Sequence, residues 1–280
     1  MAVVKEKYQI VASIVLFNHS YAQVAATLTS LLAEHCVDKI VLVDNGGAGW
    51  AASLCNDRIC YINSGYNGGF GHGHNLAMKE CLDQCDYFLI CNPDISFETG
   101  SLARLHQFAC EGGHQFVSPR IHYSDGRFQH SCRLLPAPAN LLLRRFFPRL
   151  GAKMDVSYEL HMADYKQTFS VPTVSGCFML IASPLLKKLG GFDESYFMYM
   201  EDIDLCRRAL SHTEIVYFSG ATITHVFGKG SYENAALLRH HIRSAMTYFN
   251  KWGWFFDRRR TVINRGCLKN IPMTSPVERL

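Results

Sequence analysis

Three acidic residues lie within four positions of one another in the segment YFMYMEDIDLCRRAL, residues 196–210. A run of aromatic residues and methionines precedes Glu201, Asp202 and Asp204, and a helix-like pattern follows them. A carboxylate beside such a bulky wall could take the proton of a hydroxyl group as a bond forms. In the first turn of a helix, however, the helix dipole alone would stabilise each carboxylate by about 0.3–1 kcal/mol. Spacing alone leaves catalysis and helix capping equally open.

A second polar group, CNPD at residues 91–94, follows the apolar run DYFLI. Pro93 favours an extended backbone, so the side chains of Asn92 and Asp94 can reach one point. Their oxygens suit a hard divalent cation that also binds a diphosphate. His225, at the end of ATITH, could add a nitrogen ligand, which favours manganese over magnesium. Taken alone, Asn-Pro-Asp is more often a turn, and a single histidine on a strand is usually structural.

Two further segments could approach a nucleotide. NSGYNGGFGHGHN, residues 63–75, carries five glycines before a helix-like stretch, so its backbone could lie close to an anion. It matches neither the dinucleotide nor the P-loop pattern, and an ordinary loop is an equal alternative. Asp44 follows the run KIVLV, where its carboxylate could bind a base edge or open a turn before Gly46.

The elements that must position these residues are strands alternating with helices. Apolar runs at 10–18, 39–45, 58–63 and 86–92 are separated by helical patterns at 20–35 and 73–85. This alternation predicts an α/β fold with a mostly parallel central sheet flanked by helices. Ligands of such sheets bind beyond the carboxyl ends of the strands, which is where the polar segments fall.

The second half of the chain is less regular. We expect a hairpin around 124–126, a strand at 171–183, a short helix at 183–191 and two strands at 214–218 and 221–227. Helices follow from about residue 228. Residues 133–168 lack clear periodicity, and a loop of that length is usually functional or mobile.

Composition narrows the class of protein. Of the 280 residues, 48% are hydrophobic and 19% charged, as in an ordinary globular chain. The longest apolar runs are shorter than the roughly 18–20 residues that cross a bilayer, and the N-terminal run is better explained as a strand than as a secretion signal. The 11 cysteines are scattered without a C-x-x-C pair, which favours a reducing cytosol.

Charge is uneven along the chain. The net charge of +4 combines +7 from residue 229 onward with −3 for the rest. The basic segment also carries Trp252, Trp254 and Phe255. This mixture fits an anionic membrane surface or an ordinary packed helix pair. The segment LLLRRFF, residues 141–147, is a candidate second membrane contact.

Together and in this order, the motifs resemble the inverting glycosyltransferases of family 2, which have the GT-A fold. The resemblance covers about residues 10–227. Its most specific part is GGFDESYFMYMEDIDLCRR, residues 190–208, while NGGFGHGHN, NPD and the later histidine match in order and approximate spacing. Among such enzymes, the chain is most similar to bacterial rhamnosyltransferases that extend a lipid-linked GlcNAc during O-antigen assembly.

The resemblance implies a role for each matching residue. Asp202 would be the general base, Tyr199, Glu201 and Arg208 would lie on the acceptor side, and Asp94 and His225 would hold the metal ion, Mn²⁺ or Mg²⁺. The residues that would bind the nucleotide sugar are Phe17, Asp44, Asn45, Gly68, Gly69, Asn75 and Asn92. One departure is that Asn92 replaces the first aspartate of the Asp-x-Asp motif, which puts metal affinity in doubt.

The resemblance also implies substrates and location. The donor would be dTDP-rhamnose or a UDP-sugar, and the acceptor a polyprenyl-diphosphate-linked GlcNAc at the inner face of the cytoplasmic membrane; no nucleic acid is expected. The expected domains are a GT-A domain at 1–228, with a nucleotide-sugar half to about 118 and an acceptor half from 119, and a basic helical appendage at 229–280. Rival hypotheses are a nucleotidyltransferase and a catalytically silent membrane scaffold.

Overall fold

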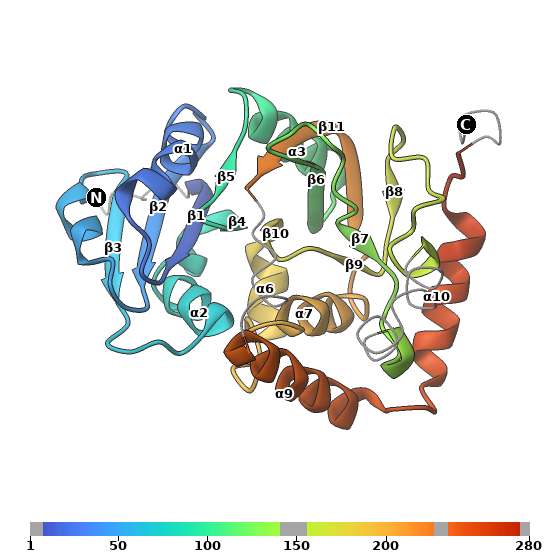
Figure 1. Ribbon diagram of the computed structural model, residues 1–280. Coiled ribbons are helices and arrows are strands. Elements are labelled where there is room, and N and C mark those ends of the chain that lie inside the picture. The colour runs from blue at the N-terminus through green and yellow to red at the C-terminus, as the bar shows by residue number, and fades with distance from the viewer. Residues whose placement is uncertain (1–7, 141–155, 227–234, 275–280) are drawn as a thin grey trace, which may run out of the picture.

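The computed structural model describes residues 8–140, 156–226 and 235–274. Within them, nine strands form a mixed sheet in the order β3-β2-β1-β4-β10-β6-β11-β5, with β8 also paired to β11 (Figure 1). A separate two-stranded sheet pairs β7 with β9. The strands are β1 (Tyr8–Leu16), β2 (Val37–Asp44), β3 (Ile59–Asn63), β4 (Cys85–Cys91), β5 (Ile95–Ser96), β6 (Phe116–Tyr123), β7 (Cys132–Arg133), β8 (Phe169–Ser170), β9 (Thr173–Val174), β10 (Phe178–Ala182) and β11 (Val216–His225).

Helices cover both faces of the sheet. They are α1 (Tyr21–Leu32), α2 (Phe70–Cys81), α3 (Ser101–Gly112), α6 (Ser183–Leu189), α7 (Glu201–Ala209), α9 (Ala235–Trp252) and α10 (Arg258–Asn270), with short 3₁₀ turns η1 (Gly49–Leu54) and η2 (Leu82–Gln84). Alternate residues of β1 enter different cores: Ile10 and Ile14 pack with α1 and α3, whereas Val11 and Val15 pack with α2, α6 and α7. Two covered faces explain why this strand is apolar from Ile10 to Leu16 apart from Ser13, whose hydroxyl contacts His74.

The predicted parallel arrangement is confirmed for the first half of the chain. β3, β2, β1 and β4 run parallel, with Leu16 opposite Asp44 and Asp44 opposite Asn63. β10 is antiparallel to both β4 and β6, and β11 is parallel to β6. Strands β4 and β11 therefore point the same way, so their carboxyl ends reach the same edge of the sheet.

Four details differ from the sequence prediction. The two strands expected at 214–218 and 221–227 are one strand, β11, because an irregularity between Phe218 and Thr222 lets the chain stay paired with β6. The single strand expected at 171–183 is divided into β9 and β10. Helix α3, which the prediction omitted, packs on β11 and β6. The turn at 124–126 is confirmed, but its returning arm forms only a bridge between His122 and Phe128.

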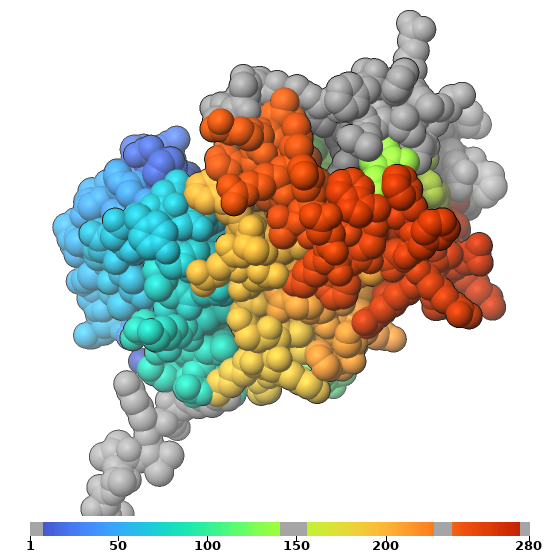
Figure 2. All heavy atoms as spheres, turned by 90° about the horizontal axis from the view of Figure 1, so that it is seen from below, coloured from blue at the N-terminus to red at the C-terminus, as the bar shows by residue number. Residues whose placement is uncertain are grey.

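The C-terminal helices extend along the lower edge and right side of the molecule (Figure 1). Seen from below, orange α9 lies against the yellow segment of the chain that precedes α7 (Figure 2). Trp252 is half-buried, and its indole N–H donates to Asp204 at 2.8 Å. The predicted membrane-contact segment 141–147 lies outside the described residues. No helix in the described ranges combines the length and the apolar character needed to cross a bilayer.

Candidate active site

Asp202 lies in the first turn of α7, and its carboxylate meets a glycine. Gly176, in the loop between β9 and β10, donates its backbone N–H to Oδ2 of Asp202 at 3.0 Å. A Cβ at Gly176 would lie 3.0 Å from the Asp202 Cβ, so glycine permits this approach. Burial raises the pKa of Asp202, while the Gly176 N–H and the charge of Arg133 lower it. A carboxylate with a raised pKa is a stronger base, as proton abstraction requires.

Asn92, Asp94 and His225 lie together at the carboxyl ends of β4 and β11. The Nε2 atom of His225 is 3.4 Å from Asp94 Oδ1 and 3.4 Å from Asn92 Nδ2. Nδ1 of His225 is 3.2 Å from the amide oxygen of Gln129, which orients the ring. Burial lowers the pKa of His225, but its contacts with Asp94 and Cys177 raise it to about 10. The sequence prediction brought the three residues together correctly and missed Gln129.

One short loop connects these two groups. Gly176 contacts Asp202, and the next residue, Cys177, accepts the backbone N–H of Asn92 at 2.8 Å. Consecutive Cα atoms are about 3.8 Å apart, so the predicted base and the predicted metal site are anchored on neighbouring residues. No local sequence pattern indicates the role of this loop, because both contacts are tertiary.

Asp44 has the geometry of a turn former. Its carboxylate accepts the N–H groups of Gly46 at 2.7 Å and Ala48 at 3.1 Å, together with the Tyr61 hydroxyl at 3.0 Å. These bonds match the turn alternative, and base binding by Asp44 stays a prediction. Its neighbour Asn45 differs: in the described structure its buried Oδ1 has no hydrogen-bond partner.

The glycine-rich loop is tied to the segment before α7. Asn45 Nδ2 donates to the Gly69 carbonyl at 2.9 Å, and the Phe70 N–H donates to the Phe197 carbonyl at 3.1 Å. Gly69 has φ +95°, and a Cβ there would lie 2.0 Å from the Phe197 carbonyl oxygen. At Gly68 a Cβ would meet the His72 ring. Gly69 is therefore required by close backbone packing, whereas Gly68 leaves room for the His72 side chain.

The other predicted donor-side residues have different environments. Phe17, after β1, is 47% exposed and its ring lies beside the Gly46 turn, so the ring is available for stacking. Asn75 is fully engaged: its amide binds the Phe192 backbone at 2.8 and 2.9 Å and Glu194 at 2.8 Å. The structure thus gives Asn75 a part in positioning the segment before α7.

The three predicted acceptor-side residues, Tyr199, Glu201 and Arg208, lie at the start of α7 or on it. Tyr199 and Met200 both have φ +68°, an unusual conformation for non-glycine residues that turns the chain sharply into α7. Glu201 is buried, and burial together with Asp202 raises its pKa well above the usual range. Arg208 donates to Asp204 at 2.8 Å and to the carbonyls of Leu189 and Gly191, so its guanidinium holds α7 to the preceding turn.

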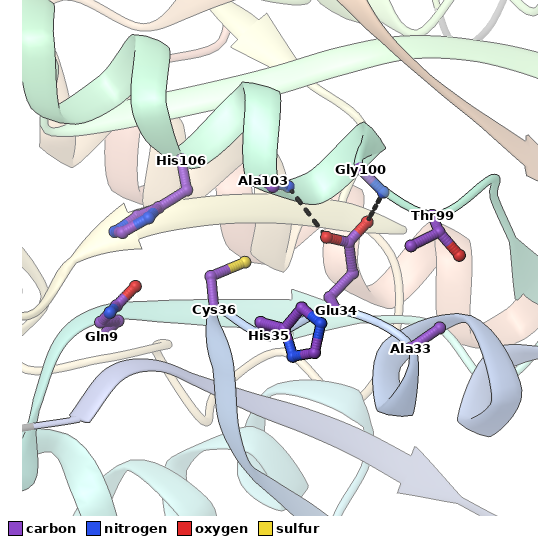
Figure 3. Close-up of a pocket in the computed structure, with 9 residues that line it drawn as sticks. All are labelled: Gln9, Ala33, Glu34, His35, Cys36, Thr99, Gly100, Ala103 and His106. Carbon is purple, nitrogen blue, oxygen red and sulfur yellow. Dashed lines mark hydrogen bonds between the residues drawn. The ribbon is translucent and has the colours of Figure 1, made fainter.

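Two cavities among the described residues are lined by residues other than the predicted base and metal ligands. One, of about 370 Å³, lies between the amino ends of β1 and β2, with Gln9 and Cys36, and helix α3, with His106 (Figure 3). Glu34 in its wall binds the first backbone N–H groups around α3, at 2.7 Å for Gly100. Another, of about 460 Å³, lies between α2 and α6 beside Asn75 and Glu194. We place the candidate site by its polar geometry at the strand ends.

The fold and these strand-end residues define the class of protein. Solved structures with similar folds are GalNAc-T7 with UDP, GalNAc and Mn²⁺ (TM-score 0.61, 11% identity, 86% of this chain and 48% of that one) and Staphylococcus aureus TarS 1-349 with UDP (TM-score 0.58, 14% identity, 93% and 70%). These are GT-A glycosyltransferases. The sequence model of glycosyl transferase family 2 matches residues 12–190, so this chain belongs to that family.

The curated relatives of this chain are also named as glycosyltransferases. Rhamnosyltransferase WbbL of Escherichia coli K12 is 26% identical over 267 residues, 90% of this chain and 95% of WbbL. The hexosyltransferase Agl10 of low-salt glycan biosynthesis in Haloferax volcanii is 28% identical over 70% of this chain, which spans only 61% of Agl10. The N-acetylglucosaminyl-diphospho-decaprenol L-rhamnosyltransferase of Mycobacterium tuberculosis is 28% identical over 63% of this chain and 62% of its own length.

Proposed function

We propose that this chain is an inverting glycosyltransferase that moves L-rhamnose from dTDP-rhamnose to a polyprenyl-diphosphate-linked GlcNAc in bacterial O-antigen or related surface-polysaccharide biosynthesis. The observation that carries the proposal is the 175–177 loop. Through it, Asp202 and the Asn92–Asp94–His225 group are anchored one residue apart. Anchoring on adjacent residues keeps the proposed base and the proposed diphosphate site in a fixed relation to each other, as transfer of a sugar between them requires.

The chemistry follows from this placement. Asp202 takes the proton of the acceptor hydroxyl as its oxygen attacks the anomeric carbon. The bond from that carbon to the diphosphate breaks on the opposite face, and its electron pair leaves with the nucleoside diphosphate. A single displacement inverts the anomeric centre and needs one base, which typically contributes 10²–10⁴-fold.

Donor binding would use the strand ends. The exposed ring of Phe17 can stack on the base, and the unpartnered Oδ1 of Asn45 can accept a hydrogen bond from the donor. The close-packed Gly68–Gly69 backbone shapes the floor beside them. Asp44 would contribute mainly by fixing the turn that positions Asn45.

A divalent cation is usual in this family, and the GalNAc-T7 structure contains Mn²⁺. In the described part of the chain, no cluster of three or more His, Cys, Asp or Glu side chains could hold one. Asp94 and His225 nevertheless fit as a pair, because a carboxylate and an imidazole nitrogen converge there beside the Asn92 amide. Diphosphate oxygens and water would complete the shell. When bound, the cation would offset the charge that develops on the leaving group.

The substrate assignment rests on the relatives' names, and one alternative has specific support. WbbL and the Mycobacterium tuberculosis relative are rhamnosyltransferases, and the second one's name specifies a lipid-linked GlcNAc. The structures of TarS and GalNAc-T7 were determined with UDP. Transfer from a UDP-sugar to another glycan acceptor is therefore the second candidate function.

A lipid-linked acceptor would require work at a membrane. Phe255 and Phe256, between α9 and α10, are 77% and 100% exposed, and exposed Arg258 and Arg259 follow at once. Aromatic side chains beside arginines suit an anionic lipid surface. We place the chain in the cytoplasm, peripheral to the inner face of the cytoplasmic membrane.

The deciding experiment is a donor screen with a synthetic polyprenyl-diphosphate-GlcNAc acceptor, with and without chelator. We expect turnover with dTDP-rhamnose, release of dTDP, and a product whose anomeric configuration is opposite to that of the donor. Turnover only with a UDP-sugar would select the alternative function. Retained configuration would reject the displacement, and no turnover with any donor would favour the silent scaffold.

A further inference from the structure

Helix α9 lies against residues 197–199, which lead into α7, the helix that carries Asp202. The Phe197 and His240 rings stack with centroids 4.4 Å apart, and the Ser244 hydroxyl donates to the Met198 carbonyl at 2.7 Å. Tyr199 and His241 are in ring contact at 4.9 Å. These contacts hold the left-handed turn that introduces α7.

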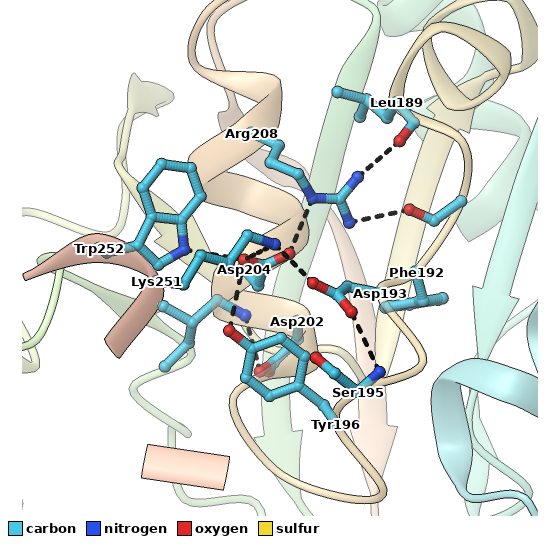
Figure 4. A network of polar contacts seen from close by, with 12 residues as sticks. Leu189, Phe192, Asp193, Ser195, Tyr196, Asp202, Asp204, Arg208, Lys251 and Trp252 are labelled. Atoms are coloured by element: carbon cyan, nitrogen blue, oxygen red, sulfur yellow. Dashed lines mark hydrogen bonds and ion pairs between the residues drawn. The ribbon is translucent and has the colours of Figure 1, made fainter. Parts of the chain in front are cut away.

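The last turn of α9 reaches α7 itself. The Trp252 indole N–H and the Lys251 ammonium both bind Oδ1 of Asp204 at 2.8 Å, while Arg208 binds Oδ2 at 2.8 Å (Figure 4). Lys251 also binds Asp193, which precedes residues 197–199, at 2.6 Å. Asp204 is fully buried, so its charge depends on these three donors and on the Tyr196 hydroxyl, which donates to Oδ1 at 3.5 Å.

A second buried ion pair, Arg207 with Asp257, strengthens the contact between α7 and the C-terminal helices. Arg207 is 1% exposed, and its guanidinium lies 4.4 Å from the centroid of the Trp252 ring. It binds Asp257, the N-cap of α10, at 2.6 Å and the Tyr248 hydroxyl at 3.1 Å. The ring of Trp252 thus packs on one α7 arginine while its N–H binds an α7 aspartate.

We propose that Lys251 and Trp252 are positioning residues for the transfer reaction: they fix the first turn of α7 so that Asp202 stays against the Gly176 N–H. This inference rests on the proposed function for its catalytic meaning. Asp202 is two residues from Asp204 in the same helical turn, so a shift of Asp204 moves Asp202 with it. Because the chain enters α7 through two strained residues, the helix start needs this external support.

The proposal has a measurable electrostatic consequence. The Gly176 N–H lowers the pKa of Asp202, so weakening that bond raises the pKa. The other groups that act on the same carboxyl are the Ile203 N–H, which donates to Oδ1 at 2.8 Å and moves with the same helix turn, Glu201 on that helix, Arg133 on β7, Tyr158 and Cys206. They are untouched in variants at 251 and 252, which leaves the Gly176 bond as the one altered contribution.

The test uses the full chain with Trp252→Phe and Lys251→Met. Trp252→Phe keeps an aromatic ring over Arg207 and removes the N–H together with the five-membered part of the indole. One lost hydrogen bond corresponds to about a 2–10-fold drop in kcat, with the donor KM unchanged. In both variants the acid limb of the kcat/KM profile should move to higher pH. Lys251→Arg keeps a positive charge at this position, so its kcat and its pH profile should be close to those of the wild type.

A matched control is Trp254→Phe, which also deletes an indole N–H from this helix pair. Trp254 donates to Asn250 and packs on Phe249, away from Asp204. We expect no change in kcat or in the pH profile. The Lys251→Met and Trp252→Phe variants could instead lose active protein and melt at a lower temperature while their pH profile stays unchanged. That result would show a purely structural role and overturn the proposal.

A readout without turnover separates this inference from the proposed function. The Gly176 amide resonance should titrate with Asp202, and labelling with ¹³C-serine and ¹⁵N-glycine restricts its assignment to the Ser–Gly pairs at 64–65, 175–176 and 219–220. A higher midpoint in Trp252→Phe supports positioning even if dTDP-rhamnose is not the donor. An unchanged midpoint overturns it whatever the donor is.

Discussion

Gly176 donates its backbone N–H to Asp202 at 3.0 Å, across 26 positions of sequence. The same loop receives the Asn92 N–H one residue later. The Ile203 N–H donates to the other carboxylate oxygen, Oδ1, at 2.8 Å, so each oxygen of Asp202 accepts one backbone hydrogen bond. Each oxygen keeps a lone pair for a substrate proton, and the orientation of the carboxylate is fixed before the substrate arrives. The contact between Gly176 and Asp202 therefore leads to a prediction about the variant Asp202→Asn.

Asp202→Asn should fold normally and lose about 10²–10⁴-fold in kcat, because the amide keeps the Gly176 bond but cannot take a proton. Steady-state kinetics with a circular dichroism spectrum would check both parts. The control is Asp125→Asn, an exposed turn residue whose loss should leave kcat within experimental scatter. Near-normal turnover of Asp202→Asn would remove the base assignment.

Asn92→Asp should strengthen metal binding. A carboxylate beside Asp94 and His225 adds a charged oxygen where this chain has an amide, and hard cations favour that change. The concentration of Mn²⁺ that gives half-maximal activity should fall, and His225→Ala should raise it. Titration of Mn²⁺ after chelator treatment measures both. Identical titration curves for wild type and the two variants would place the cation elsewhere.

Gly69→Ala should weaken both the fold and donor binding. The new Cβ would meet the Phe197 carbonyl at 2.0 Å, and φ is +95°. Strain and overpacking of this kind each cost about 1–3 kcal/mol. Urea unfolding and calorimetric dTDP binding provide the measurements. Gly49→Ala is the control, since a Cβ there meets nothing within 4 Å. Equal stability of both variants would contradict the close approach.

Folding stability should fall in mild acid because of a buried histidine. Burial lowers the pKa of His74 from 6.5 to about 3, and its Nδ1 contacts Ser13 at 2.9 Å. Between those values the unfolded chain binds more protons, so protonation favours unfolding as pH drops below 6.5. His74 should contribute a loss of about 2 kcal/mol between pH 7 and pH 5.

Urea unfolding at the two pH values measures that loss. The variant His74→Gln should show a smaller difference between pH 7 and pH 5 than the wild type, even if it is less stable at both. His35→Gln, at an exposed position, should keep the full difference. If His74→Gln retains it as well, other groups cause the acid sensitivity.

The aromatic residues between α9 and α10 should bind anionic lipid. The double variant Phe255→Ser with Phe256→Ser should float with phosphatidylglycerol vesicles several-fold less than the wild type, because two exposed rings of about 150–250 Å² each are lost. Neutral vesicles should bind both proteins poorly. Val262→Ser, also exposed, is the control for a general loss of apolar surface. Equal flotation of all proteins would remove the membrane contact.

The sequence predicted the strand ends well, since those depend on local patterns. Apolar runs flanked by helices gave the parallel half of the sheet, and Asn92, Asp94 and His225 indeed meet. The start of α7 at Glu201 was also correct. Helix α3 had an available signal that was overlooked: glycines at both caps and buried Leu102, Leu105 and Ala109 at helical spacing.

Other parts depend on tertiary contacts that no local pattern shows. Nothing around Gly176 indicates that it meets Asp202, and nothing in the C-terminal segment indicates that Trp252 reaches Asp204. The spacing of Asp202 and Asp204 does carry information, because side chains two residues apart on a helix are rotated by about 200° from each other. Asp202 and Asp204 therefore had to face different surroundings, which separates a candidate base from a buried partner of Lys251 and Arg208.

The packing of α9 on the segment before α7 also bears on enzyme engineering. The family match ends at residue 190, whereas Asp202 and the contacts at Ser244, Lys251 and Trp252 lie beyond it. A chimera that exchanged only residues 191–209 with a relative would join a foreign turn to a native helix and mismatch their shared surface. Recombination aimed at new acceptors should therefore transfer residues 191–257 as one block.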